Sequence, residues 1–151
     1  MSTDRKKILI VDDDENIRTT MSCVLEARGF DVDTAETGGE AMEKGSKSFY
    51  NLALFDIRLP DMEGTDLLKN FKRVSPTTIK IMLTGYPQVE NAIKAVNNGA
   101  DAYFTKPADI DKLLKTIEEK LNDQKNDERK TEDEFGLLLK KRAEKLKSQL
   151  R

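Results

Sequence analysis

Residues 7–15 read KILIVDDDE, a short apolar run that ends abruptly in four acidic residues. An apolar run of this length, without polar alternation, is typical of a strand that is buried on both faces of a parallel sheet. Four comparable runs follow, at residues 30–34 (FDVDT), 51–55 (NLALF), 78–83 (TIKIML) and 101–105 (DAYFT). The sequence therefore predicts five strands, of which the first, third and fourth are the most continuously apolar.

Five segments with helix-like character separate or follow these runs. In four of them apolar residues recur every three or four positions, which places them on one helix face. The four sets are Ile17, Met21 and Val24; Leu67, Phe71 and Val74; Val89, Ile93 and Val96; and Ile110, Leu114, Ile117 and Leu121. Gly29 and Gly99 follow the first and third sets as typical helix stops. Alternating strands and helices predict an α/β fold, a doubly wound five-stranded parallel sheet with helices on both faces.

The pattern changes after residue 121. Residues 122–134 (NDQKNDERKTEDE) contain no apolar residue, which indicates a charged linker or an exposed helical extension. Residues 135–151 carry six Lys or Arg against one Glu. On a helix their apolar residues share one arc: Phe135, Leu138, Leu139, Ala143, Leu146 and Leu150. We therefore divide the chain into a domain at 1–121, the charged segment at 122–134 and a basic amphipathic helix at 135–151.

Composition excludes several classes of function. The 151 residues include no histidine and a single cysteine, Cys23, so a His-assisted nucleophile and a Cys/His zinc site are both unavailable. A net charge of −2 argues against direct binding to nucleic acid. No stretch is apolar enough to span a bilayer, and the N-terminal MSTDRKK lacks the apolar core of a signal peptide. We therefore expect a cytoplasmic location and neither a membrane nor a nucleic-acid partner.

Reactive side chains stand at the ends of four predicted strands. Asp12 to Glu15 follow the first, Asp56 the third, Thr84 the fourth and Lys106 the fifth. The carboxyl ends of parallel strands meet at one edge, so these groups should converge there. Clustered carboxylates favour a bound cation, and oxygen ligands near phosphate favour Mg²⁺. A carboxylate beside Mg²⁺, an ammonium group and a hydroxyl is suited to phosphoryl transfer.

Simpler explanations exist for each motif taken alone. The acids at 12–15 would suit the N-terminus of a helix, where they oppose the positive end of its dipole. The Leu59-Pro60-Asp61 segment after Asp56 would suit a turn, and Lys106 would suit a solvated surface. Their joint occurrence at the ends of four strands favours a common site.

Four segments, IVDDDENIR, LFDIRLPDMEG, IMLTG and GADAYFTKP, resemble the marker segments of bacterial and archaeal response-regulator receiver domains. The resemblance extends over about residues 6–121. It implies a flavodoxin-like sheet in the order 2-1-3-4-5, which is the order that this family is known for.

The resemblance also implies a role for each site residue. Asp56 would accept the phosphoryl group, Lys106 would pair with it, and Thr84 and Tyr103 would respond as switch residues. The Lys106-Pro107 peptide would be cis. Mg²⁺ or Mn²⁺ would be held by Asp12, Asp13, Asp56 and the backbone carbonyl of Arg58.

The implied function is a phosphorylation-activated signalling switch, not an enzyme, although the domain would catalyse its own phosphotransfer and autodephosphorylation. A sensor histidine kinase or a phosphotransfer protein would donate the phosphoryl group. The output protein, and self-association as a homodimer, stay open.

Two alternatives use a similar sheet. A haloacid-dehalogenase-like phosphatase would need the first strand to supply its nucleophile; Asp12 and Asp14 fit that pattern but Asn16 does not. An FMN-binding flavodoxin-like module would need a phosphate loop, and the first loop here is acidic.

Overall fold

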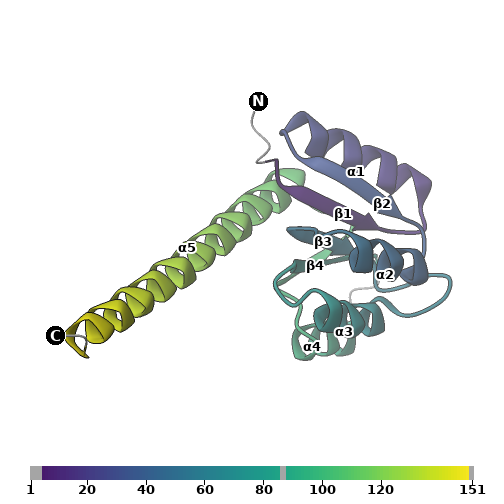
Figure 1. Ribbon diagram of the computed structural model, residues 1–151. Helices are drawn as coiled ribbons and strands as arrows, with labels where there is room; N and C mark the ends of the chain where they lie inside the picture. Colours follow the sequence, from purple (N-terminus) through teal and green to yellow (C-terminus); the bar gives the residue numbers. More distant parts are fainter. Residues whose placement is uncertain (1–4, 86–87, 150–151) are drawn as a thin grey trace.

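The computed structural model describes residues 5–85 and 88–149, and within these ranges five parallel strands form one sheet in the order β2-β1-β3-β4-β5 (Figure 1). The strands are β1 Lys7–Val11, β2 Asp31–Ala35, β3 Leu52–Phe55, β4 Ile79–Thr84 and β5 Ala102–Thr105. The helices are α1 Glu15–Ala27, α2 Gly38–Lys47, α3 Gly64–Val74, α4 Val89–Asn97 and α5 Ile110–Gln149. The predicted fold class and strand order are confirmed, with strand ends shifted by one residue at most.

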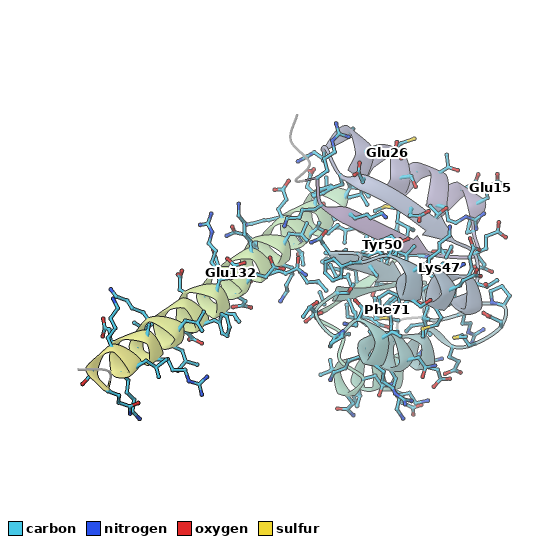
Figure 2. The ribbon with its side chains drawn as sticks, viewed as in Figure 1. Glu15, Glu26, Lys47, Tyr50, Phe71 and Glu132 are labelled. Carbon is cyan, nitrogen blue, oxygen red and sulfur yellow. The ribbon has the colours of Figure 1, made fainter. Side chains whose placement is uncertain are left out.

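The sheet separates two apolar layers, because successive side chains of a strand point to opposite faces. In β1, Ile8 and Ile10 face the layer formed by α1 and α5, whereas Leu9 and Val11 face α2, α3 and α4. Phe71 of α3 lies in the second layer (Figure 2). Its ring is edge-on to that of Phe55, with centroids 5.4 Å apart. Coverage of both faces explains why β1, β3 and β4 are continuous in apolar residues.

Helix α4 is confirmed as a helix, but its apolar spacing does not mark the face that contacts the sheet. Ile93 and Val96 are 55% and 67% exposed, whereas Ala95 is fully buried. A methyl side chain lets the helix backbone approach the sheet closely, and Ile93 and Val96 lie outside the contact.

Helix α5 is one continuous helix of 40 residues, about 60 Å long at 1.5 Å per residue. Its first turns pack on the sheet through Leu113, Leu114, Ile117 and Leu121. Gln124 is the last buried residue. Its amide donates to the backbone oxygens of Asn51 and Thr77, at 3.1 and 2.8 Å. These two oxygens precede β3 and β4, so the helix leaves the domain at the amino edge of the sheet.

Residues 125–149, which we call the projecting segment, are exposed throughout and extend away from the domain (Figure 1). The helix continues without a break through 122–134, which contain good helix formers and neither glycine nor proline. No helix in the described ranges combines the length and the hydropathy that crossing a bilayer requires.

Candidate functional site

The carboxyl ends of β1, β3 and β5 bring four of the predicted site residues together. Carboxylate oxygens of Asp12, Asp13 and Asp56 all lie within 4.8 Å of one another. The Lys106 ammonium nitrogen, Nζ, lies 2.5 Å from Oδ2 of Asp12 and 3.1 Å from Oδ2 of Asp56. All four residues border one cavity of about 370 Å³, which Arg58 also lines. The expected convergence of charged groups at this edge is therefore present.

Burial and pairing set the charges in this site. Burial raises the pKa of Asp12. The hydrogen bonds that its carboxylate accepts from Lys106 and from the Asp14 backbone N–H act to lower this pKa, but burial outweighs them. Burial alone would lower the pKa of Lys106, but Asp12 and Asp56 together outweigh it and raise that pKa. Lys106 therefore stays protonated at neutral pH and offsets part of the negative charge of the carboxylates.

Asp56 presents two different oxygen atoms. Oδ2 accepts a hydrogen bond from Lys106, whereas Oδ1 is buried and has no hydrogen-bond partner among the described residues. A buried oxygen without a partner lowers stability, by about 1–3 kcal/mol in typical cases, and most native structures avoid it. Because Asp56 also lines the cavity, its carboxylate is suited to meet a cation or an electrophile that enters there.

The four acids after β1 divide into two roles. Asp14 is the N-cap of α1: its carboxylate accepts the backbone N–H groups of Asn16 and Ile17. The helix-terminus explanation therefore holds for Asp14. Asp12 is buried and turned toward Lys106, Asp13 is exposed beside it, and these two acids form the carboxylate cluster with Asp56.

The loop after Asp56 is a turn that is fastened to a neighbouring helix. The backbone N–H of Leu59 donates to the oxygen of Met62 at 3.2 Å. The Asp61 carboxylate accepts the N–H groups of Gly38 and Gly39 at the start of α2, at 2.9 and 2.8 Å. The turn explanation for this segment is thus correct, and the turn also holds one wall of the cavity in place.

Two residues that support the site were missed from the sequence. Arg18 of α1 donates to the backbone oxygen of Asp12 at 2.8 Å and lies 3.5 Å from a carboxylate oxygen of Glu36. At Gly64, a Cβ atom would lie 1.8 Å from the backbone oxygen of Asp56, so only glycine fits. Arg18 and Gly64 end two of the segments that resemble the family markers, IVDDDENIR and LFDIRLPDMEG, and that position is the signal that could have found them.

The remaining predicted residues lie nearby in the sheet. Thr84 is fully buried at the end of β4, the strand that pairs with β3. Tyr103 of β5 is half-buried against the α2–α4 layer. The Lys106-Pro107 peptide is cis, as expected.

The family model of the response regulator receiver domain matches residues 8–118. The chain belongs to this family. Receiver domains are signalling modules of two-component phosphorelays rather than classical enzymes, which agrees with the predicted class. The family that matches is therefore neither the phosphatase family nor the flavodoxin-like family considered as alternatives.

Known relatives extend the comparison. The transcriptional regulatory protein ZraR of Klebsiella oxytoca is 37% identical over 121 residues, which are 80% of this chain and 27% of ZraR. The chain thus spans about a quarter of the length of that relative.

Solved structures agree with this placement. A CheY-like receiver domain from Methanospirillum hungatei is 48% identical, with a TM-score of 0.80 over 82% of this chain and 98% of that one. A response regulator from Burkholderia pseudomallei, solved with a phosphorylated aspartic acid, calcium ion and citrate, is 28% identical. Its TM-score is 0.72 over 82% of this chain and 72% of that one.

Proposed function

We propose that this chain is a phosphorylation-activated switch in which Asp56 accepts a phosphoryl group from a histidine kinase or a phosphotransfer protein. The observation that carries the proposal is the asymmetry of the Asp56 carboxylate. One oxygen is held by Lys106, and the other is buried without a hydrogen-bond partner among the described residues, beside a cavity lined by acids. The phosphorylated aspartate in the Burkholderia relative supports the same chemistry.

In the transfer, an oxygen of the Asp56 carboxylate attacks phosphorus while the bond from phosphorus to the donor nitrogen breaks. The donor imidazole keeps that bond's electron pair and leaves. Lys106 lies next to Oδ2 and offers positive charge to the phosphoryl oxygens as the acyl phosphate forms. Water would later hydrolyse the acyl phosphate and reset the switch.

The acidic cluster fits a divalent metal ion. Asp12, Asp13 and Asp56 offer only oxygen atoms, which is the donor set that Mg²⁺ and Mn²⁺ prefer, and the backbone carbonyl of Arg58 would add a further ligand. A bound ion would supply positive charge that neutralises the phosphoryl oxygens. This assignment follows from the chemistry of the cluster and from the family resemblance.

The signal would then leave the site through Thr84 and Tyr103. A phosphoryl group on Asp56 would draw the Thr84 hydroxyl toward its oxygens, because the end of β4 lies beside the end of β3. Tyr103 would turn inward as the loop after β4 moves, and the surface around α4 and β5 would change its affinity for an output protein. Such a response is a population shift between two packings. We place this switch in the cytoplasm, where its kinase would meet it.

Incubation with acetyl phosphate and Mg²⁺ tests the proposal. Wild type should gain the mass of one phosphoryl group, and hydroxylamine should remove it, as expected of an acyl phosphate. Asp56→Asn should gain none, because an amide does not attack phosphorus. Asp14→Asn is the matched control: it should label like wild type, because Asp14 caps α1 and asparagine also caps helices. Equal labelling of Asp56→Asn and wild type would refute the assignment.

A further inference from the structure

The projecting segment, residues 125–149, is a helix that needs a partner. All of its residues are exposed, and none of them takes part in the ion pairs formed within the described ranges. Most helices in proteins gain their stability from packing an apolar face, and this part of α5 packs its apolar face against none of the described residues. Phe135, Leu138, Leu139 and Leu146 are 50–61% exposed. The segment thus carries both an unpaired apolar face and unpaired charges.

A seam with heptad spacing runs along this face. Residues separated alternately by three and four positions lie on one side of a helix and form the contact line of a coiled coil. In the projecting segment such a line contains Lys125, Glu128, Glu132, Phe135, Leu139, Arg142, Leu146 and Gln149. Phe135 and Leu139 form its apolar centre, Glu128 and Glu132 lie on one side of the centre, and Arg142 lies on the other.

The two halves of the segment have opposite charge. Residues 125–134 contain five acidic and three basic residues, whereas residues 135–149 contain five basic residues and one acidic residue. A parallel pair of such helices would place acid against acid and base against base. An antiparallel pair places each acidic half against a basic half.

We propose that the projecting segments of two copies of this chain pair as antiparallel helices, with the two-fold axis at the level of residue 137. In this register, Phe135 meets Leu139 of the second copy, and Glu132 meets Arg142 of the second copy. The two Phe135–Leu139 layers lie at the centre, and a Glu132–Arg142 ion pair flanks them on each side. Gly136, which has no side chain, lies next to the axis and lets the helices approach closely.

The domain leaves room for this partner. The face of α5 that carries Glu128 and Glu132 borders an open cavity of about 690 Å³ at the amino edge of the sheet. Glu132 is exposed on the helix (Figure 2). Acidic residues dominate the charged lining of this cavity: Asp101, Asp123, Asp127, Glu128 and Glu132, against Lys120 alone. The basic end of the second helix would reach this cavity. Both phosphoacceptor sites would stay accessible, because they lie at the opposite edge of the sheet.

The same charges disfavour a membrane surface as the partner. Glu128 and Glu132 share the face of the apolar residues, so an anionic bilayer that contacts Phe135 and Leu139 would also meet these two carboxylates. In the antiparallel register a second copy pairs Phe135 with Leu139 and Glu132 with Arg142, and it sets Glu128 opposite Leu146 at the edge of the contact.

Sedimentation of the full chain at about 100 µM, within the range of weak protein association, tests the pairing. Wild type should approach twice its monomer mass of 17.1 kDa. Leu139→Gln should be monomeric. Leu137→Gln is the matched control, since Leu137 is 55% exposed but lies on the other side of the helix, and it should remain dimeric. Asp56→Asn should also remain dimeric, so the outcome is independent of the proposed phosphorylation.

Charge reversal tests the orientation. Glu132→Arg and Arg142→Glu should each be monomeric alone, because each places like charges opposite one another at both ends of the pair. The double variant, and an equimolar mixture of the two single variants, should dimerise like wild type. A monomeric wild type would overturn the proposal, as would single variants that dimerise normally. Wild type that stays monomeric but binds phosphatidylserine vesicles through Leu139 would assign the segment to a membrane instead.

Discussion

Replacing Gly64 with alanine should damage both the stability of the domain and its acceptor site. The new Cβ would lie 1.8 Å from the backbone oxygen of Asp56 and 2.7 Å from its carbonyl carbon, whereas close C···O contacts are about 3.3 Å. Neither side can move freely. The N–H of Asp56 donates to the oxygen of Val11 at 3.0 Å, and the N–H of Gly64 donates to the oxygen of Ile57 at 2.5 Å. The start of α3 or the end of β3 must therefore shift by more than about 1 Å.

The magnitude follows from this clash. Overpacking against fixed groups destabilises by about 1–3 kcal/mol, and a backbone contact at this distance belongs at the upper end. At about 3 °C per kcal/mol for a chain of this size, the melting temperature should fall by about 9 °C. A displacement of about 1 Å at a reacting group can slow its chemistry about 100-fold, so labelling by acetyl phosphate should slow as well.

Thermal unfolding followed by circular dichroism, together with the labelling rate, measures both effects of Gly64→Ala. Gly85→Ala is the matched stability control, because a Cβ there would have no atom of the described residues within 4 Å. Its melting temperature should stay within about 2 °C of wild type, as for an ordinary surface substitution. If Gly64→Ala melts and labels like wild type, the close approach of α3 to Asp56 does not constrain the site.

Three further predictions concern charge. Lys106→Gln should slow labelling by acetyl phosphate about 100-fold, as for loss of one stabilising donor, with the rate read from intact mass. Saturating Mg²⁺, at about 100 times its Kd, should raise the free energy of unfolding of wild type and of Asp14→Asn by about 2.7 kcal/mol, as measured by urea titration. Asp13→Asn should lose most of this stabilisation. An undiminished stabilisation of Asp13→Asn would remove Asp13 from the metal site. Burial alone would raise the pKa of Asp33, but hydrogen bonds led by that of Tyr50 outweigh it and hold the pKa below 3.8. The stability that Asp33 contributes is therefore present above that pH and lost as pH falls through the lowered pKa, so Asp33→Asn and wild type should converge in stability in strong acid.

The sheet and the position of the site were predictable because both depend on repeated local signals. In β1, β3 and β4, burial on both faces requires apolar residues at nearly every position, and this requirement is visible in the sequence as nearly continuous apolar runs. Asp12 and Asp56 follow two of these strands directly and Lys106 follows β5, so the parallel topology alone brings them to one edge. The roles within the acid run were less predictable, since only the structure separates Asp14, which caps α1, from Asp12, which faces Lys106.

Features that depend on tertiary contacts could not be predicted from the sequence. Helix α2 has few apolar residues, and its start is fixed by the hydroxyl of Thr37 and by Asp61 from a distant loop. In α4, Ala95 is buried, and its small size gives a weak signal beside the exposed Ile93 and Val96. The charged residues after 121 suited a linker or a helix equally well. The structure continues α5 through them, because nothing in their sequence interrupts a helix that the domain has already started.

The most direct test of the account is to locate the acyl phosphate by chemistry. After labelling with acetyl phosphate, borohydride reduction converts a phosphorylated aspartate into homoserine, and peptide sequencing by mass spectrometry reads its position. We expect homoserine at position 56 and aspartate unchanged at positions 12, 13 and 14. Homoserine at position 12 would make the first strand the source of the nucleophile, as in the phosphatase alternative, and would contradict the assignment of Asp56.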